Sequence, residues 1–396
     1  MTRVKRCILI GLLGVLIVAS GWFYYLYFMS TDAAIRHAET FLFRRMAETN
    51  IGQPGDFRHF FVTNRNQEPG DSSLEERFGS KRTDTLKFGA FDTSIEPSMG
   101  LGMLINPTSW FQNEEIRLDD VQQFEKDAFV ERLRHYVDRS PARTLLIVIH
   151  GFRERFPSAL RKTAFVASVL DIDTTVLLFD WPGDQGSSLS GYRQAREVAQ
   201  ASGADFARTL EIIIREVQPD RVSLIANSMG GQVVVDAFSV LYQEADFSDT
   251  EAELDHIVLT APDVGHDEFN ERFKDEITAL ANDLTVYVSS NDRALLVSRL
   301  INRGLRVGES TLSPDQLDEA SSISTLVEPA SDLITLVDVT PVNRTRNFHN
   351  FSLETPEFFD DLFLRLTSDE VVTRNRRIYR VQTPDDAVYW VLTRGR

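Results

Sequence analysis

The sequence contains a single cysteine, Cys7, which lies in an N-terminal apolar run. One cysteine cannot form a disulfide within the chain, so cysteine usage does not indicate a redox compartment. Its position excludes thiolate catalysis and a cysteine-rich zinc site in the remainder of the chain. No other group of side chains has the spacing of a metal site, so we expect neither a metal nor an organic cofactor.

Positive charge is also scarce, because 42 Lys and Arg stand against 59 Asp and Glu, for a formal net charge of -17. Three basic residues and no acidic ones lie within residues 1–29, so residues 30–396 carry a net charge of -20. Nucleic-acid binding needs clustered basic side chains that contact phosphates. The acidic balance therefore argues against a nucleic acid as partner, and its ordinary effect is solubility.

The N-terminus has a long apolar run, residues 7–29, without a charged residue. A helix of this length would be about 35 Å long, enough to cross a hydrocarbon core of about 30 Å. Aromatic residues gather at its far end, as they do at membrane interfaces. We expect an uncleaved single-pass anchor, and the alternative is a signal peptide cleaved near Ala19 and Gly21. The preceding basic residues would keep the N-terminus cytoplasmic and place the body on the outer side, periplasmic or extracytoplasmic.

The rest of the chain divides by composition and pattern. We expect a juxtamembrane helix and linker over residues 30–56, with the helix at 30–49. A main domain over 57–370 and a C-terminal β-hairpin extension over 371–396 follow. The hairpin is expected from two β-rich runs, Ile378–Gln382 and Val388–Thr393, on either side of a Pro-Asp-Asp turn.

The first part of the main domain has mixed patterns. Phe57–Arg65 and Leu86–Ile95 are expected to be strands, with a polar loop over residues 66–85 between them. Asp119–Val137 has helical periodicity. Residues 307–332 are rich in Ser, Asp and Glu and are expected to form a surface loop or insertion.

From residue 144 onward, short apolar runs alternate with longer amphipathic segments. The expected strands are Thr144–His150, Thr175–Asp180, Arg221–Asn227, His256–Asp263, Leu284–Asp292 and Leu333–Thr340. The expected helices are Pro157–Leu170, Gly191–Val217, Gly230–Gln243 and Asp267–Asp283. Nearly continuous Val, Ile and Leu runs between helices indicate a mostly parallel sheet buried on both faces. The predicted fold class is α/β, with helices on both faces of the sheet.

Ser228, in Ala226-Asn227-Ser228-Met229-Gly230, is the predicted nucleophile. It follows a buried-strand pattern and precedes an amphipathic helix, the context of a strand–turn–helix nucleophile elbow. Small residues are needed two positions before and after the serine, where side chains would collide with backbone. Ala226 and Gly230 meet that need, although the usual first residue is glycine.

A serine hydroxyl needs a base, and the base needs an orienting acid. His349 follows the last expected strand, where the histidine of a Ser-His-Asp triad belongs in this kind of fold. We therefore prefer it to His266 as the base. Asp292 closes the penultimate strand of the series and is the preferred acid. Asp263 closes the strand before it and is the alternative acid.

The oxyanion of the tetrahedral intermediate also needs hydrogen-bond donors. His150-Gly151-Phe152 follows the first strand of the regular series, where a His-Gly pair shapes an oxyanion loop. We expect the backbone N–H groups of Phe152 and Met229 to be the donors. His150 itself is expected to be structural and to bond loop backbone.

The sequence resembles an uncharacterised bacterial family of predicted α/β hydrolases in the esterase/lipase superfamily. The resemblance covers about residues 57–365 and depends on motifs in this order: Phe61-Val62-Thr63-Asn64-Arg65, Ile149-His150-Gly151-Phe152, Phe179-Asp180-Trp181-Pro182-Gly183-Asp184, Ala226-Asn227-Ser228-Met229-Gly230-Gly231, Ala261-Pro262-Asp263 and Ser290-Asn291-Asp292-Arg293-Ala294-Leu295. It implies an α/β-hydrolase fold and a serine triad, and it supplies no substrate. One departure is Thr93–Gly102, which lacks the family's usual histidine.

The expected function is a serine hydrolase that works through an acyl-enzyme on Ser228, with a carboxylic ester as the preferred substrate class and an amide as the second candidate. Expected partners are a small-molecule or lipid ester substrate and, through residues 7–29, a membrane. The sequence contains no signal for a particular oligomeric state. The alternative is a catalytically inactive, membrane-anchored binding or scaffold protein on the same fold, because fold alone does not confer activity.

Overall fold

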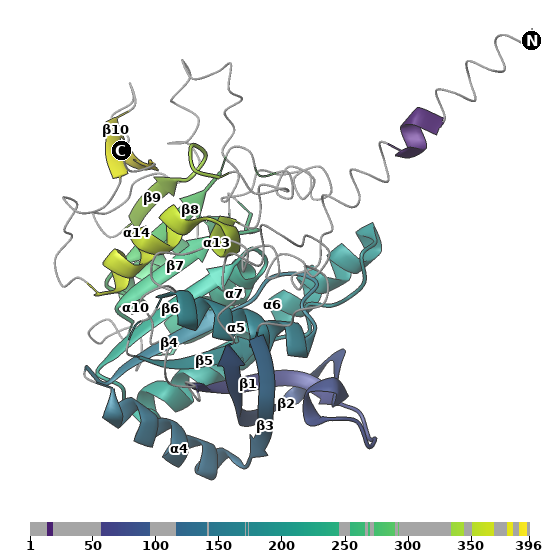
Figure 1. The fold of residues 1–396 in the computed structure, drawn as a ribbon. Helices are drawn as coiled ribbons and strands as arrows, with labels where there is room; N and C mark the ends of the chain where they lie inside the picture. The colour runs from purple at the N-terminus through teal and green to yellow at the C-terminus, as the bar shows by residue number, and fades with distance from the viewer. Residues whose placement is uncertain are drawn as a thin grey trace, which may run out of the picture.

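The structure is a computed structural model (Figure 1). It describes residues 14–18, 57–95, 116–140, 142–170, 172, 174–244, 254–265, 268–269, 273–289, 292, 334–343, 351–367, 378–382 and 388–393. The helix expected at 30–49, the loop expected at 307–332, His266 and His349 lie outside these residues. Of the apolar run 7–29 only residues 14–18 are described, and no helix in the described part of the chain is long and apolar enough to cross a membrane.

Among the described residues, one sheet of eleven strands runs in the order β10-β11-β9-β8-β7-β6-β4-β5-β1-β2-β3. The neighbouring pairs from β11 to β1 are parallel, whereas β10–β11, β1–β2 and β2–β3 are antiparallel. The strands are β1 (Phe57–Gln67), β2 (Phe78–Ile95), β3 (Ile116–Phe124), β4 (Thr144–Ile149), β5 (Thr175–Asp180), β6 (Arg221–Asn227), β7 (His256–Thr260), β8 (Leu284–Val288), β9 (Ile334–Asp338), β10 (Ile378–Gln382) and β11 (Val388–Leu392).

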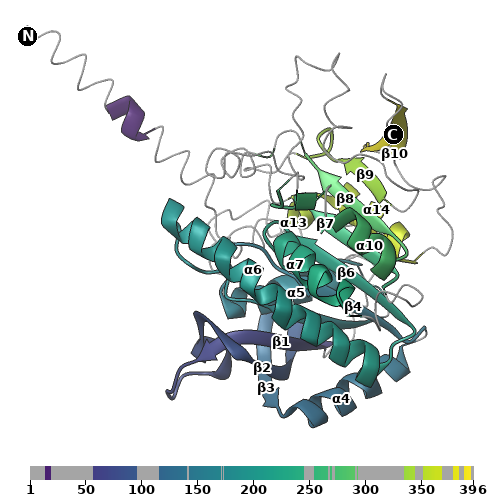
Figure 2. The ribbon, with the colours of Figure 1, turned by 180° about the vertical axis from the view of Figure 1, so that it is seen from behind.

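Helices cover both faces of this sheet. On one face lie α4 (Lys126–Arg139), α6 (Leu189–Ile212) with the π-helical turn η3 (Ile213–Val217), α7 (Gly230–Tyr242) and α10 (Lys274–Leu280). On the other lie α5 (Phe156–Leu170), α13 (Phe351–Glu354) and α14 (Pro356–Thr367). Figure 2 shows α6, α7 and α10 in front of the strands, seen from behind the view of Figure 1. A short 3-10 helix, η1 (Leu74–Arg77), precedes β2.

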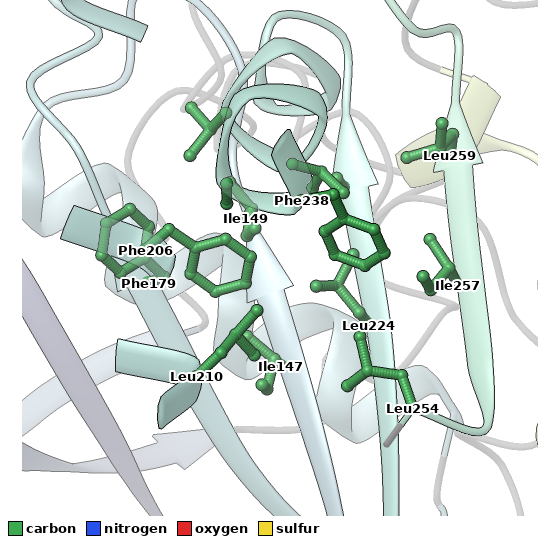
Figure 3. Close-up of a cluster of buried hydrophobic side chains, with 14 of the residues drawn as sticks. Ile147, Ile149, Phe179, Phe206, Leu210, Leu224, Phe238, Leu254, Ile257 and Leu259 are labelled. Carbon is green, nitrogen blue, oxygen red and sulfur yellow. The ribbon is translucent and has the colours of Figure 1, made fainter. Parts of the chain in front are cut away.

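The central strands β4 to β8 are largely apolar because each one is buried on both sides. In β4, Ile147 and Ile149 belong to the core under α6 and α7, whereas Leu146 and Val148 belong to the core under α5. Alternate side chains of a strand point to opposite faces, so a two-sided sheet needs apolar residues at every position. Figure 3 shows the first of these cores. The labelled side chains come from β4, β5, β6, β7, the helices that cover them and the segment just before β7: Ile147, Ile149, Phe179, Leu224, Ile257, Leu259, Phe206, Leu210, Phe238 and Leu254.

The α/β prediction is confirmed from β4 to β9, where every expected strand is present with ends within a few residues. The expected hairpin is also present as the antiparallel pair β10–β11, and β11 pairs with β9, so the hairpin continues the main sheet.

Two expectations for the first part of the domain are wrong. Residues 66–85 are not all loop, because η1 and the first half of β2 lie there. Asp119–Val137 is not one helix, because β3 occupies Ile116–Phe124 and α4 begins at Lys126. Both segments are rich in polar residues, since β3 is at the sheet edge and the first half of β2 is half-buried or exposed apart from Phe78. Edge strands with charged side chains carry little apolar periodicity.

The chain order of the strands reverses around β4. β5 pairs with one side of β4, and β6 returns to pair with its other side. In open α/β sheets, sites form at the carboxyl ends of strands where the order reverses, because the two connections diverge to opposite faces. The carboxyl ends of β4 and β6 therefore mark the candidate site, and these ends precede Gly151 and Ser228.

Candidate active site

Ser228 occupies a sharp turn between β6 and α7. Its φ is +53°, a left-handed backbone conformation that is uncommon for a residue with a side chain. Its backbone N–H donates to the carbonyl of Thr260 at 2.9 Å, and its carbonyl accepts from the N–H groups of Gly231 and Asp263 at 3.0 and 3.1 Å. These bonds hold the strained turn from both sides. The strand–turn–helix context expected for Ser228 is therefore present.

The turn depends on small residues because the neighbouring backbone is very close. A Cβ atom on Gly230 would lie 2.6 Å from the carbonyl oxygen of His150 and 3.0 Å from that of Ile149. Ala226, two residues before the serine, is completely buried. A larger residue at either position would push the turn away from the end of β4.

The loop after β4 is in direct contact with the serine. A Cβ atom on Gly151 would lie 3.0 Å from Cβ of Ser228 and 3.1 Å from the carbonyl oxygen of Asn227. Phe152 follows, with its ring edge-on to Tyr192 at 5.6 Å between centroids. The two predicted oxyanion donors, Phe152 and Met229, thus follow directly the two residues, Gly151 and Ser228, that are in contact.

His150 has the structural contacts that we expected of it. Its Nδ1 lies 2.9 Å from the carbonyl oxygen of Gly151, and its Nε2 lies 2.9 Å from Oδ1 of Asp180. Its ring stacks on the indole of Trp181 at 5.5 Å, and the indole N–H donates to the carbonyl of His150 at 2.9 Å. The histidine is 1% exposed, so it is enclosed below the loop.

Both candidate acids are buried at the carboxyl edge of the sheet. Asp263 follows β7 and accepts a hydrogen bond on Oδ2 from the hydroxyl of Tyr192 at 2.5 Å. Asp292 follows β8, and its N–H donates to the carbonyl of Ser289 at 3.2 Å. The choice between the two depends on their relation to His349, which lies outside the described residues, so it stays a prediction.

Asn227 is a site residue that sequence reasoning missed. Its amide nitrogen donates to the hydroxyls of Thr260 and Ser352, each at 2.9 Å, and its Oδ1 accepts from Nζ of Lys162 at 3.2 Å. These bonds join the residue before Ser228 to β7, to α13 and to α5. A polar residue directly after the apolar run 224–226 was the available signal.

Lys162 is unusual because it is a buried cation in α5, only 5% exposed. Burial lowers the pKa of Lys162, and the carboxylate of Glu154, 3.9 Å from Nζ, opposes this effect. Glu154 is itself buried and accepts from the hydroxyl of Ser158 at 2.9 Å.

Within the described ranges, no group of three or more His, Cys, Asp or Glu side chains is placed to hold a metal ion.

A protein-family model described as "Alpha/beta hydrolase of unknown function (DUF900)" matches residues 125–363. The chain belongs to this family. The match to these α/β hydrolases begins at Glu125, just before α4, and ends at Phe363 within α14. The α/β-hydrolase fold expected from the sequence is thereby confirmed, and the three N-terminal strands and the C-terminal hairpin of this α/β hydrolase lie outside the matched range.

No curated protein matches the chain. Similar solved structures include the ydeN gene product from B. subtilis, at 15% identity and a TM-score of 0.29, with 57% of this chain and 100% of that chain covered. A putative hydrolase from Agrobacterium vitis S4 is similar at 11% identity and a TM-score of 0.32, with 72% and 95% covered. A thermophilic esterase from Thermogutta terrifontis, with propionate bound, is similar at 12% identity and a TM-score of 0.29, with 57% and 84% covered.

Proposed function

We propose that this α/β hydrolase is a serine hydrolase that cleaves carboxylic esters through an acyl-enzyme on Ser228. The observation that carries the proposal is the turn at Ser228, which has a positive φ at the end of β6 and is in contact with the loop after β4. Such a turn lifts the hydroxyl above the sheet edge, beside backbone N–H groups that can receive an oxyanion.

In the proposed reaction, His349 removes the proton of the Ser228 hydroxyl as Oγ attacks the ester carbonyl carbon. The negative charge that forms on the carbonyl oxygen is held by the N–H groups of Phe152 and Met229. His349 then gives its proton to the leaving alcohol as the C–O bond breaks. A water molecule attacks the acyl group by the same steps in reverse and releases the acid. Asp292 orients the imidazole and balances its charge.

The described contacts of α13 support His349 as the base. Ser352, at the start of α13, accepts a hydrogen bond from Asn227, the residue directly before Ser228. Ser352 is three residues after His349 in the sequence, and three residues span at most about 11 Å. The chain on the C-terminal side of the histidine is therefore tied to the nucleophile turn.

Asp292 is proposed as the acid and Asp263 as the alternative. One oxygen of Asp263 already accepts from Tyr192, and its own N–H donates to the carbonyl of Ser228. These two bonds suit a residue that holds the turn and the neighbouring Tyr192 ring. Asp292 follows β8, the penultimate strand of the series expected from the sequence, and lies between Ser228 and His349, as the chain order of this fold requires of the acid.

The proposed substrate is a small-molecule or lipid ester.

We further propose that residues 7–29 anchor the enzyme in a membrane, with the body on the outer side, because the run is uncharged and follows basic residues. Extraction tests the anchor: the full chain should stay with the membrane fraction in high salt and enter solution only with detergent. Release of the full chain by salt alone would contradict the anchor without affecting the reaction.

A fluorophosphonate probe with Ser228→Ala as control tests the activity. The wild-type chain should be labelled once, on Ser228, and should hydrolyse p-nitrophenyl esters, and the variant should do neither. Esters of graded acyl length then give the chain-length preference. If the folded wild-type chain is neither labelled nor active on any ester, the proposal is wrong and the inactive binding protein is the better account.

A further inference from the structure

Motifs that the proposed reaction does not use meet in one buried cluster. Thr63 and Arg65 come from β1, Asp180 ends β5, and His150 and Trp181 follow β4 and β5. β1 lies beside β5 in the sheet (Figure 1), and Thr63 is opposite Asp180 in the register of the two strands. These side chains are between 0 and 1% exposed, so their polar groups can be satisfied only by one another or by nearby backbone.

Arg65 is the centre of the cluster. Its Nε donates to Oδ2 of Asp180 at 2.7 Å, and its two terminal nitrogens donate to three carbonyl oxygens: those of Gly79 at 3.1 Å, Glu154 at 2.7 Å and Trp181 at 2.8 Å. The hydroxyl of Thr63 donates to the same Oδ2 at 2.5 Å. A buried guanidinium with this many acceptors has a fixed position, since its planar fork cannot turn without losing several bonds at once.

Asp180 balances this charge. Burial alone would raise the pKa of Asp180, but the charge of Arg65 and the hydrogen bonds from His150 and Arg65 outweigh burial and hold the pKa below its ordinary value. The carboxylate therefore stays ionised and bridges Arg65 on Oδ2 and His150 on Oδ1.

These contacts hold the loop after β4 at both of its ends. At the first end, the His150 ring contacts Asp180 and its carbonyl accepts from Trp181. At the other end, the carbonyl of Glu154 accepts directly from Arg65. Phe152, the proposed oxyanion donor, lies midway between these two residues.

We propose that Arg65 is a positioning residue for the oxyanion hole, acting through Asp180 and the carbonyl of Glu154 to fix the backbone N–H of Phe152. This inference rests on the proposed function, because it assumes that Phe152 receives an oxyanion. If Arg65 has this role, β1 contributes to catalysis although it lies outside the residues matched by the family model. The contacts of Arg65 should stabilise the transition state more than the bound ester, since the carbonyl oxygen of the ester gains its negative charge only as Oγ attacks.

Arg65→Lys in the full chain is the test, because lysine keeps the charge and loses the fork. Loss of one oxyanion donor lowers kcat by about 10²–10³-fold, so misplacement of the loop should lower kcat about 10–100-fold. KM should stay within about threefold, since the ground-state ester hardly uses the donor. A trifluoromethyl ketone, which forms a tetrahedral anion on the serine, should lose affinity by the same factor as kcat/KM.

Arg58→Lys is the matched control. Arg58 is on the same strand and half-buried, and it donates two hydrogen bonds to Asp92 on β2, at 2.7 and 2.6 Å. It should leave kcat and ketone affinity unchanged. If Arg65→Lys also leaves both unchanged, the inference is overturned while the proposed function stands. If the wild-type chain itself is unlabelled and inactive, the proposed function has failed, whatever Arg65 does.

If Arg65→Lys fails to fold, the Thr63→Val variant tests the inference instead. It nearly conserves volume and removes the 2.5 Å hydrogen bond to Asp180, together with the 3.2 Å bond that the Thr63 hydroxyl accepts from the backbone N–H of Arg65. We expect a fall in kcat of about three- to tenfold with KM unchanged, and a proportional loss of ketone affinity, because loop placement is weakened rather than lost. An unchanged kcat in a folded Thr63→Val variant would overturn the inference.

Discussion

Gly151 touches Ser228 so closely that a single methyl group would not fit between them. A Cβ atom on Gly151 would lie 3.0 Å from Cβ of Ser228, closer than ordinary van der Waals contact. Gly151 comes from the loop after β4 and Ser228 from the turn after β6. The spacing between proposed nucleophile and proposed oxyanion donor is therefore set by the absence of a side chain at residue 151.

Gly151→Ala should lower kcat about tenfold while the protein still folds. The serine or the loop must move by a few tenths of an ångström, and a displacement of about 1 Å in a catalytic group can cost about 10²-fold. Gly230→Ala should be worse, because its Cβ would be 2.6 Å from a backbone oxygen that cannot swing aside. Ester turnover and melting temperature measure both effects. Gly70→Ala, where only Ser72 lies within 4 Å, is the control, and equal activity of all three variants would contradict the close-contact account.

Asp292→Asn should reduce kcat by about 10⁴-fold, because an amide in place of the orienting carboxylate holds the imidazole in the wrong tautomer. Asp263→Asn should reduce it less than tenfold, since Asp263 is bonded to the carbonyl of Ser228 and to the hydroxyl of Tyr192 and we assign it to holding the turn. Single-turnover ester hydrolysis compares the two. The opposite ranking would assign the acid to Asp263 and leave Ser228 as nucleophile.

His59 should make the fold sensitive to acid. Its side chain is buried in β1 against Phe91, and burial lowers its pKa from 6.5 to about 4, although Asp92 opposes the shift. A histidine with a lowered folded pKa is held neutral, so the unfolded chain takes up a proton first as pH falls below 6.5. The destabilisation therefore grows from about pH 6.5 down to pH 4 and reaches about 2 kcal/mol at pH 5.

Urea unfolding at pH 7 and pH 5 measures this loss. His59→Leu should lose about 2 kcal/mol less than the wild-type chain over that interval, because it has no proton to take up at residue 59. His135→Gln, which replaces an exposed histidine on α4, should behave as wild type. Equal losses in wild type and His59→Leu would mean that another group accounts for the acid sensitivity.

Phe206→Ala should cost about 3–5 kcal/mol of unfolding free energy, since it opens a cavity in a close-packed core. Phe206 is completely buried on α6, and its ring lies 4.8 Å from that of Phe179 on β5. Val240→Ala removes an apolar side chain of α7 that is 37% exposed and should cost less than about 1 kcal/mol. Denaturant midpoints compare the two, and similar losses would show that the α6 core is less important than its burial indicates.

Much of the fold could be predicted from local pattern. Thr175–Asp180 and Arg221–Asn227 were expected at the bounds that the structure has, because a strand buried on both faces is apolar at every position. β3 could not be predicted in the same way. Its residues are mostly polar, it is at the sheet edge, and its pairing with β2 depends on residues more than twenty positions away.

The elbow at Ser228 was predictable because all its requirements lie within a few residues: a buried strand before it, glycine two positions after it and an amphipathic helix beyond. The bonds of Asn227 to Ser352 and of Arg65 to Asp180 were not predictable. They join residues that are 125 and 115 positions apart in the sequence, so the hydrophobic pattern of a single strand or helix cannot reveal them.

The sequence by itself determined which segments are strands from residue 144 onward, where α5, α6 and α7 lie, and which serine stands at a strand–helix turn. Those properties follow from hydrophobic period and residue size over short distances. Only the tertiary structure decided what surrounds that turn: Gly151 against Ser228, Asn227 joined to α13, and Arg65 beneath the loop of Phe152. The reason is the order of the strands. Pairing β4 with both β5 and β6, and β5 with β1, gathers the ends of distant segments at one edge of the sheet.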